Sequence, residues 1–223
     1  MRRESSTLVV LAGEAGGGLL AELGRSGNVS VARAPAAGQH GAGQHGAGQH
    51  GAGQHGAGQP GAAGPAQARP AWETGALAMR EAAGRQSGYV IVPDDPLADV
   101  AAAWRAMWDL AGGPGGAAAF EERAAEALAA WRDKRFELPD YYLVLATVQP
   151  GGTGPDLYLG PLRAARPRRV AVAVADGPGQ AGRVLDALRS LEHGPWWPPL
   201  GELIEAARRF YAGGLAETQR ALA

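Results

Sequence analysis

Three glycines at a fixed spacing form the clearest candidate for a binding motif in this sequence. Gly177, Gly179 and Gly182 spell G-x-G-x-x-G after the apolar run VAVAVA and before an amphipathic segment. Glycines let a backbone approach a pyrophosphate, and the free amides of a helix N-terminus favour an anion. However, a chain with 35 glycines is expected to contain this spacing about once by chance. The acid-bearing strand that should follow is also missing, so a tight turn is the simpler interpretation.

A second glycine turn, GEAGGG, follows the first apolar run of the chain. Ala15 replaces the second glycine of the dinucleotide spacing, and no Gly-Lys-Ser/Thr of a P-loop is present, so this turn does not indicate ATP hydrolysis. Gly16, Gly17 and Gly18 nevertheless open a predicted helix, where free amides could bind an anionic ligand.

Acidic residues collect where predicted strands end, at Glu14, Asp94, Asp95 and Asp176. If the strands are parallel, these carboxylates meet at the edge where open α/β sheets bind ligands, and they could hold Mg²⁺. Asp95 and Asp176 also stand where residues that cap the following helices are expected, and Pro96 suits the first helical position. Capping alone accounts for acids at these positions, so we predict no metal site.

The histidines do not form a catalytic or metal-binding pattern. His40, His45, His50 and His55 recur in the repeat QHGAG, where no geometry is preset for a metal ion. His193 has no serine or acid at a diagnostic spacing. The chain has no cysteine, which excludes disulfides, thiolate nucleophiles and cysteine-ligated metals. We therefore assign no catalytic residue and no cofactor, and the sequence leaves open whether the protein is an enzyme.

Adjacent tryptophans give a second type of candidate site. Trp196 and Trp197 stand between prolines, and two neighbouring side chains in a loop cannot both face one core. We therefore expect one of them to be exposed for contact with a protein partner. By contrast, Trp104, Trp108 and Trp131 have helical spacing and are predicted core residues.

The elements that must position these residues follow from apolar periodicity. Predicted strands cover residues 7–13, 28–34, 89–92, 141–148 and 170–175. Predicted helices cover 19–23, 71–85, 97–111, 117–136, 180–191 and 200–211, and the last is expected to continue after Gly213–Gly214 to the C-terminus. Residues 156–160, DLYLG, are predicted to form an edge strand or a turn. The strands are nearly continuous apolar runs that alternate with helices, which indicates burial on both faces. We therefore predict a three-layer, Rossmann-like α/β fold with a mainly parallel five-stranded sheet and helices on both faces.

A low-complexity segment interrupts this pattern. The pentapeptide QHGAG repeats four times from Gln39 to Gly58, without an apolar face. We predict that residues 35–70 form a disordered linker, and that residues 1–34 and 71–223 make one α/β domain around it.

Charge and hydropathy limit the possible partners. The formal net charge is −1, so no global field draws the protein to nucleic acid or an anionic membrane. The basic run Arg163, Arg166, Arg168 and Arg169 lacks interleaved aromatic residues and is expected to be a solvated edge. No run of 18 apolar residues occurs, and we expect a cytoplasmic protein.

Two functions follow from these observations. In the first, a small anionic ligand, such as a nucleotide or phosphometabolite, binds at the carboxyl edge of the sheet. Its expected site consists of Gly16, Gly17, Gly18, Asp94, Asp95, Asp176, Gly177, Gly179 and Gly182. In the alternative, the protein is a non-catalytic interaction protein that uses the Trp196–Trp197 loop and helix faces against a protein partner.

Overall fold

The computed structural model describes residues 6–13, 15–35, 69–108, 113–146, 156–174 and 177–222. Its strands are β1 (Thr7–Ala12), β2 (Val29–Val31), β3 (Tyr89–Val92), β4 (Tyr141–Ala146) and β5 (Val170–Val174). Its helices are α1 (Gly17–Gly24), α2 (Ala71–Ala82), α3 (Ala98–Trp108), α4 (Gly113–Arg132), α5 (Arg163–Ala165), α6 (Gln180–Arg189) and α7 (Leu200–Leu222), with a π-helical turn η1 (Tyr158–Leu162) and a 3₁₀ turn η2 (Pro167–Arg169). Nearly all of the predicted linker, residues 35–70, lies outside the described residues.

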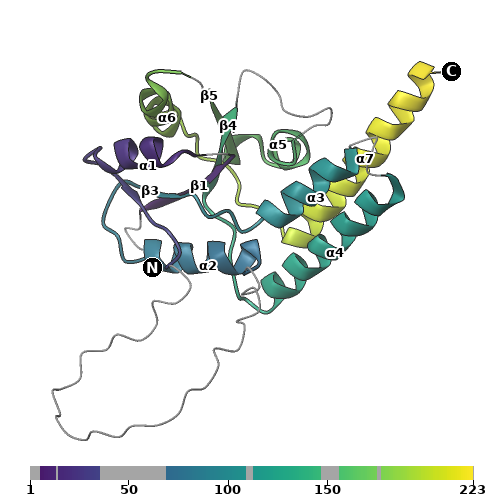
Figure 1. The fold of residues 1–223 in the computed structure, drawn as a ribbon, viewed down its shortest axis with the longest axis horizontal. Coiled ribbons are helices and arrows are strands. Elements are labelled where there is room, and N and C mark those ends of the chain that lie inside the picture. Colours follow the sequence, from purple (N-terminus) through teal and green to yellow (C-terminus); the bar gives the residue numbers. More distant parts are fainter. Residues whose placement is uncertain are drawn as a thin grey trace, which may run out of the picture.

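The five strands form one parallel sheet in the order β2-β3-β1-β4-β5 (Figure 1). β1 pairs with both β3 and β4 and is therefore the central strand. Strands from before and after the predicted linker join in this sheet. Helices cover both of its faces, which confirms the predicted three-layer, Rossmann-like α/β fold.

The alternation of side chains along the strands divides the core into two layers. Val9, Leu11 and Leu143 pack toward α1 and α6, whereas Val10 and Tyr142 pack toward α2, α3, α4 and α7. All five side chains are at most 1% exposed. Because both faces of the sheet are buried, the strands require apolar residues at consecutive positions, and this is the pattern the sequence contains.

Two segments differ from their predicted form. α4 begins at Gly113 rather than at residue 117, because a helix tolerates proline in its first turn and Pro114 stands there. The segment predicted as an edge strand or a turn is helical, and it leads into η1. The cause is Asp156, whose carboxylate accepts the backbone N–H groups of Tyr158 and Leu159 at 2.8 and 3.2 Å and so caps this helical turn.

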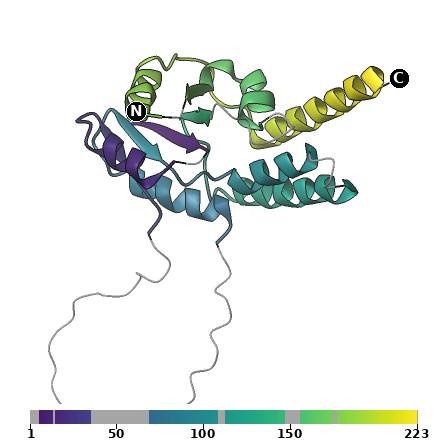
Figure 2. The same ribbon diagram turned by 45° about the horizontal axis from the view of Figure 1, so that its top comes forward.

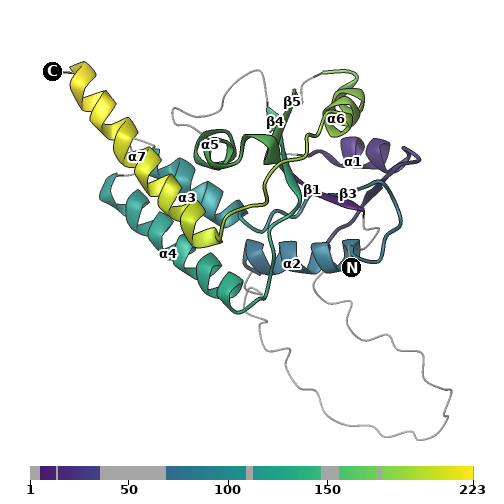
Figure 3. The same ribbon diagram turned by 180° about the vertical axis from the view of Figure 1, so that it is seen from behind.

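α3, α4 and α7 pack together beside the sheet and extend away from it (Figures 2 and 3). Trp104 is fully buried at their centre, with ring centroids 5.6 Å from Phe120, 5.8 Å from Trp108 and 6.3 Å from Tyr211. Trp108 and Trp131 are partly buried against the same cluster, as the helical spacing predicts. Among the described helices, none combines the length and the hydropathy needed to cross a membrane.

Candidate ligand site at the carboxyl edge of the sheet

The strand order reverses at β1. From β1 the chain continues through α1 to β2 on one side, and from β3 it continues through α3 and α4 to β4 on the other side. In open α/β sheets, ligands bind outside the carboxyl ends of the strands at such a reversal. Here the reversal lies at the ends of β1 and β4, where Gly13 follows β1 with a φ of +116°. A Cβ at Gly13 would lie 3.1 Å from the carbonyl oxygen of Leu145, so glycine is required there.

The N-terminus of α1 is open at this edge. Gly16 is the N-cap residue, its backbone is extended, and no side chain of the described residues caps the helix. Gly16, Gly17 and Gly18 are all exposed, and a Cβ at any of them would meet no atom within 4 Å. The amides of the first turn therefore face solvent, and the positive end of the helix dipole favours an anion there.

A groove with a volume of about 660 Å³ runs past the first turn of α1 to the ends of β2 and α2. Gly17 and Arg33 line it, together with several apolar side chains. Arg33 is exposed and makes no ion pair within the described part of the chain. Arg85 also lines the groove, but its guanidinium lies 3.7 Å from the carboxylate of Glu81. Arg33 is therefore the cation of this groove that can meet a ligand without first breaking an ion pair.

The G-x-G-x-x-G turn follows β5, an edge strand, rather than the central strand. Gly177 and Gly179 have φ values of +76° and +77°, which glycine adopts without strain, so the turn itself explains both residues. Gly182 lies within α6, and a Cβ there would meet no atom within 4 Å. The third glycine of a dinucleotide fingerprint serves close packing of helix and strand, and Gly182 makes no such contact.

The two glycine turns share the carboxyl edge. α6 contacts α1 on the same face of the sheet (Figure 1). Within the described ranges, neither helix has a side-chain cap at its N-terminus. Two of the predicted residues, Glu14 and Asp176, lie outside the described residues.

Asp94 and Asp95 hold the backbone at the end of β3. Asp94 accepts the N–H of Ala34 at 2.8 Å and so ties the residues after β2 to those after β3. Asp95 accepts the N–H of Leu97 at 2.8 Å, which is the capping contact expected before α3. No group of three or more histidine, aspartate or glutamate side chains within the described ranges is arranged to hold a metal ion.

Asp95 also takes part in a buried cluster with two tyrosines. The hydroxyl of Tyr158 donates a hydrogen bond to its second carboxylate oxygen. Burial raises the pKa of Asp95 to about 6, against the opposing effect of the hydrogen bonds from Tyr158 and Leu97. Burial and the charge of Asp95 together raise the pKa of Tyr158 and of Tyr142 well above the ordinary value. The Tyr142 hydroxyl is buried, and among the described residues it makes no hydrogen bond of normal geometry.

The adjacent tryptophans have opposite environments. Trp197 is 5% exposed, and its indole N–H donates to the carbonyl oxygen of Pro139 at 2.7 Å, so it belongs to the core and has no surface for a partner. Trp196 is 53% exposed. Of the two residues predicted as partner contacts, Trp196 alone reaches the surface.

The basic run before β5 is a solvated edge only in part: Arg163 and Arg168 are exposed, as the sequence predicts, but Arg169 is buried. Arg169 is 9% exposed and lies between the rings of Tyr141 and Trp196, with its guanidinium carbon 4.9 Å from each ring centroid. Arg166 donates to the carbonyl oxygen of Trp196 at 2.7 Å, and Arg168 pairs with Glu192 at 3.2 Å. Arg166, Arg168 and Arg169 thus hold the segment between α6 and α7 against the sheet.

Sequence reasoning missed Arg33, Tyr142 and Tyr158. Arg33 is a single arginine after a short strand and has no motif around it. The two tyrosines stand among apolar residues in the sequence, where they suggest only core packing. Tyr158 also lies 63 residues from Asp95 in the chain. Comparisons with protein-family models, with curated proteins and with solved structures found no match to this chain.

Proposed function

We propose that the protein binds a small anionic ligand, a nucleotide or a phosphorylated metabolite, at the carboxyl edge of its sheet. The observation that carries the proposal is the position of Arg33, which has no ion pair in the described structure and lines one groove with Gly17 at the uncapped N-terminus of α1. Backbone amides and an arginine fork are a common pair of donors for phosphate groups. Neither Arg33 nor Gly17 has a visible structural task that would compete with a ligand.

The proposal is one of binding. His193 is exposed, and among the described residues its side chain has no hydrogen bond to a serine or an acid. An activated nucleophile needs such a partner. The site thus offers groups that hold and orient an anion, and no described pair of groups that would attack it.

Binding can be tested by thermal unfolding with ATP, ADP and inorganic pyrophosphate, each with and without Mg²⁺. A ligand at a hundred times its dissociation constant is expected to stabilise the chain by ~2.7 kcal/mol. We expect Arg33→Gln to weaken binding by about tenfold, since it removes a charge-assisted hydrogen bond. Arg25→Gln is the matched control, because Arg25 is also exposed and unpaired in the described structure but lies at the other end of α1.

Gly17→Asp separates binding from stability. An acid in the first turn of α1 is expected to stabilise the helix by about 0.3–1 kcal/mol, while its charge repels an anion. Affinity for pyrophosphate should therefore fall although the midpoint of thermal unfolding does not. The proposal is wrong if no anion stabilises the wild-type chain, or if Arg33→Gln and Gly17→Asp bind as tightly as the wild type.

Exposure of Trp196 supports a second proposal, contact with a protein partner. Large aromatic side chains are the residues that most often dominate protein interfaces, and this one is 53% exposed. A second copy of the chain is the partner that can be tested directly. We expect sedimentation equilibrium of the wild type at ~100 μM to show association and Trp196→Ala to reduce it at least tenfold. A wild-type chain that stays monomeric at this concentration would contradict the proposal.

A further inference from the structure

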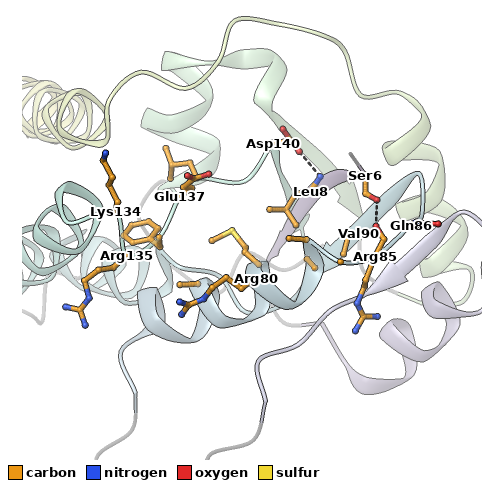
Figure 4. Close-up of a pocket in the computed structure, with 17 residues that line it drawn as sticks. Ser6, Leu8, Arg80, Arg85, Gln86, Val90, Lys134, Arg135, Glu137 and Asp140 are labelled. Atoms are coloured by element: carbon orange, nitrogen blue, oxygen red, sulfur yellow. Dashed lines mark hydrogen bonds between the residues drawn. The ribbon is translucent and has the colours of Figure 1, made fainter. Parts of the chain in front are cut away.

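A second cavity lies at the opposite, amino-terminal edge of the sheet, between α2 and the segment that joins α4 to β4 (Figure 4). Its volume is about 860 Å³, which is within the range of small-molecule sites. It shares Arg85 with the groove described above but contains none of the residues on which the proposed function depends.

The floor of this cavity is apolar and its rim is basic. Among its apolar lining residues, Leu8 and Met79 are partly exposed, and Phe136 and Leu138 are buried. Four cations and two carboxylates line the cavity, which leaves an excess of two positive charges in a chain whose net charge is −1. The carboxylate of Asp140 is already engaged, since it accepts the N–H of Leu8 at 2.7 Å.

Three of the four cations make no ion pair among the described residues. Arg80 is exposed on α2, and Lys134 and Arg135 are exposed on the other side of the cavity (Figure 4). Arg135 lies over the ring of Trp72, with its guanidinium carbon 4.1 Å from the ring centroid. Glu137 is the remaining carboxylate, and it is exposed and has no ion pair in the described structure.

The backbone of Lys134 has a conformation that favours glycine. Its φ is +58°, and it is the one described residue other than glycine with a positive φ. Lys134 donates its N–H to Trp131, and Arg135 donates to Ala130, which is the hydrogen-bond pattern of a helix end that favours glycine at the Lys134 position. A chain with 35 glycines nevertheless has its single lysine there. Strained backbone positions cluster at functional sites, and Lys134 lines the cavity.

We propose that this cavity binds an amphipathic organic anion, an apolar body that carries one carboxylate, phosphate or sulfonate group. The apolar body lies on Leu8 and Met79, and the anionic group is attracted to the basic rim, to which Arg80, Lys134 and Arg135 contribute. A fully hydrophilic anion lacks the first contact, and a neutral amphipathic compound lacks the second.

The probe is 1-anilinonaphthalene-8-sulfonate, an aromatic sulfonate whose fluorescence rises in an apolar site. It is titrated into the full chain, and circular dichroism checks that the protein stays folded. Octanoate should displace it, whereas octanol and octylammonium at the same concentration should not. We expect Lys134→Gly and Arg80→Gln each to weaken probe binding by about 3- to 10-fold. Lys134→Arg, which keeps the charge, should restore it, and Arg132→Gln, an exposed arginine on the last turn of α4 outside the cavity, should leave it unchanged.

Lys134→Gly also separates function from folding. Because glycine suits the left-handed backbone, this variant should keep or raise the midpoint of thermal unfolding, by up to ~4 °C, while it loses affinity. The proposal is overturned if Lys134→Gly and Arg80→Gln both bind the probe as tightly as wild type. It is also overturned if octylammonium displaces the probe as effectively as octanoate. Arg33→Gln should not change probe binding, so the two proposals can fail independently.

Discussion

Arg169→Ala is expected to lower the free energy of unfolding by about 3–4 kcal/mol, because it removes a buried guanidinium that holds three backbone carbonyls. Arg169 donates to Gly194 at 2.8 Å and to Pro195 and Asp140 at 3.1 Å. These contacts tie the segment between α6 and α7 to the beginning of β4. Without them the carbonyls lose their donors, and the rings of Tyr141 and Trp196 lose the group packed between them.

The measurement is urea unfolding of the full chain, with Arg168→Ala as the neighbouring control. Arg168 is 62% exposed and pairs with Glu192, which is 69% exposed, so its loss should cost less than ~1 kcal/mol. Arg169→Lys should recover only part of the loss, since one ammonium group cannot reproduce the planar fork of a guanidinium. Equal effects of Arg169→Ala and Arg168→Ala would show that the buried contacts of Arg169 do not stabilise the fold.

The contrast between these two arginines shows which features a sequence can predict. The five strands and the α/β fold follow from apolar runs such as TLVVLA and YYLVLA, since burial on both faces demands them. Burial of Arg169 does not follow, because it depends on carbonyl groups some 25 residues away in the chain. The strand order is hidden for a similar reason. It depends on which side of β1 each connection crosses, and local periodicity contains no such information.

The candidate sites divide in the same way. The open glycines of α1 and the capping role of Asp95 could be predicted, since both depend on residues close together in the sequence. Arg33 and the cavity beneath Lys134 could not be predicted. The pairing of β2 with β3 positions Arg33, which follows β2, at the groove. The cavity forms where α2 packs near the segment between α4 and β4.

Asp95→Asn is expected to stabilise the protein at pH 8 and to lose that advantage at pH 4. Burial raises the pKa of Asp95 from 3.8 to about 6, so between these values the folded chain holds a proton that the unfolded chain has released. The free energy of unfolding therefore falls as the pH rises through this window, by about 3 kcal/mol for this group, and then stays level above it. Asparagine resembles the protonated acid and keeps an oxygen for the N–H of Leu97, so the variant should gain about 1–3 kcal/mol over wild type at pH 8.

Urea unfolding of both proteins from pH 4 to pH 8 measures this difference. Asp186→Asn is the control, because the Asp186 side chain is 74% exposed and pairs only at the surface, so it should change stability by less than ~0.5 kcal/mol. Tyr158→Phe should act in the opposite direction to Asp95→Asn at pH 8. It removes the donor that stabilises the buried carboxylate, which costs about 1–3 kcal/mol at pH 8 and less at pH 4, where the acid is neutral. Lower stability of Asp95→Asn than of wild type at pH 8 would contradict this prediction. It would mean that the folded chain favours the ionised Asp95 carboxylate, so that folding does not raise the pKa of Asp95.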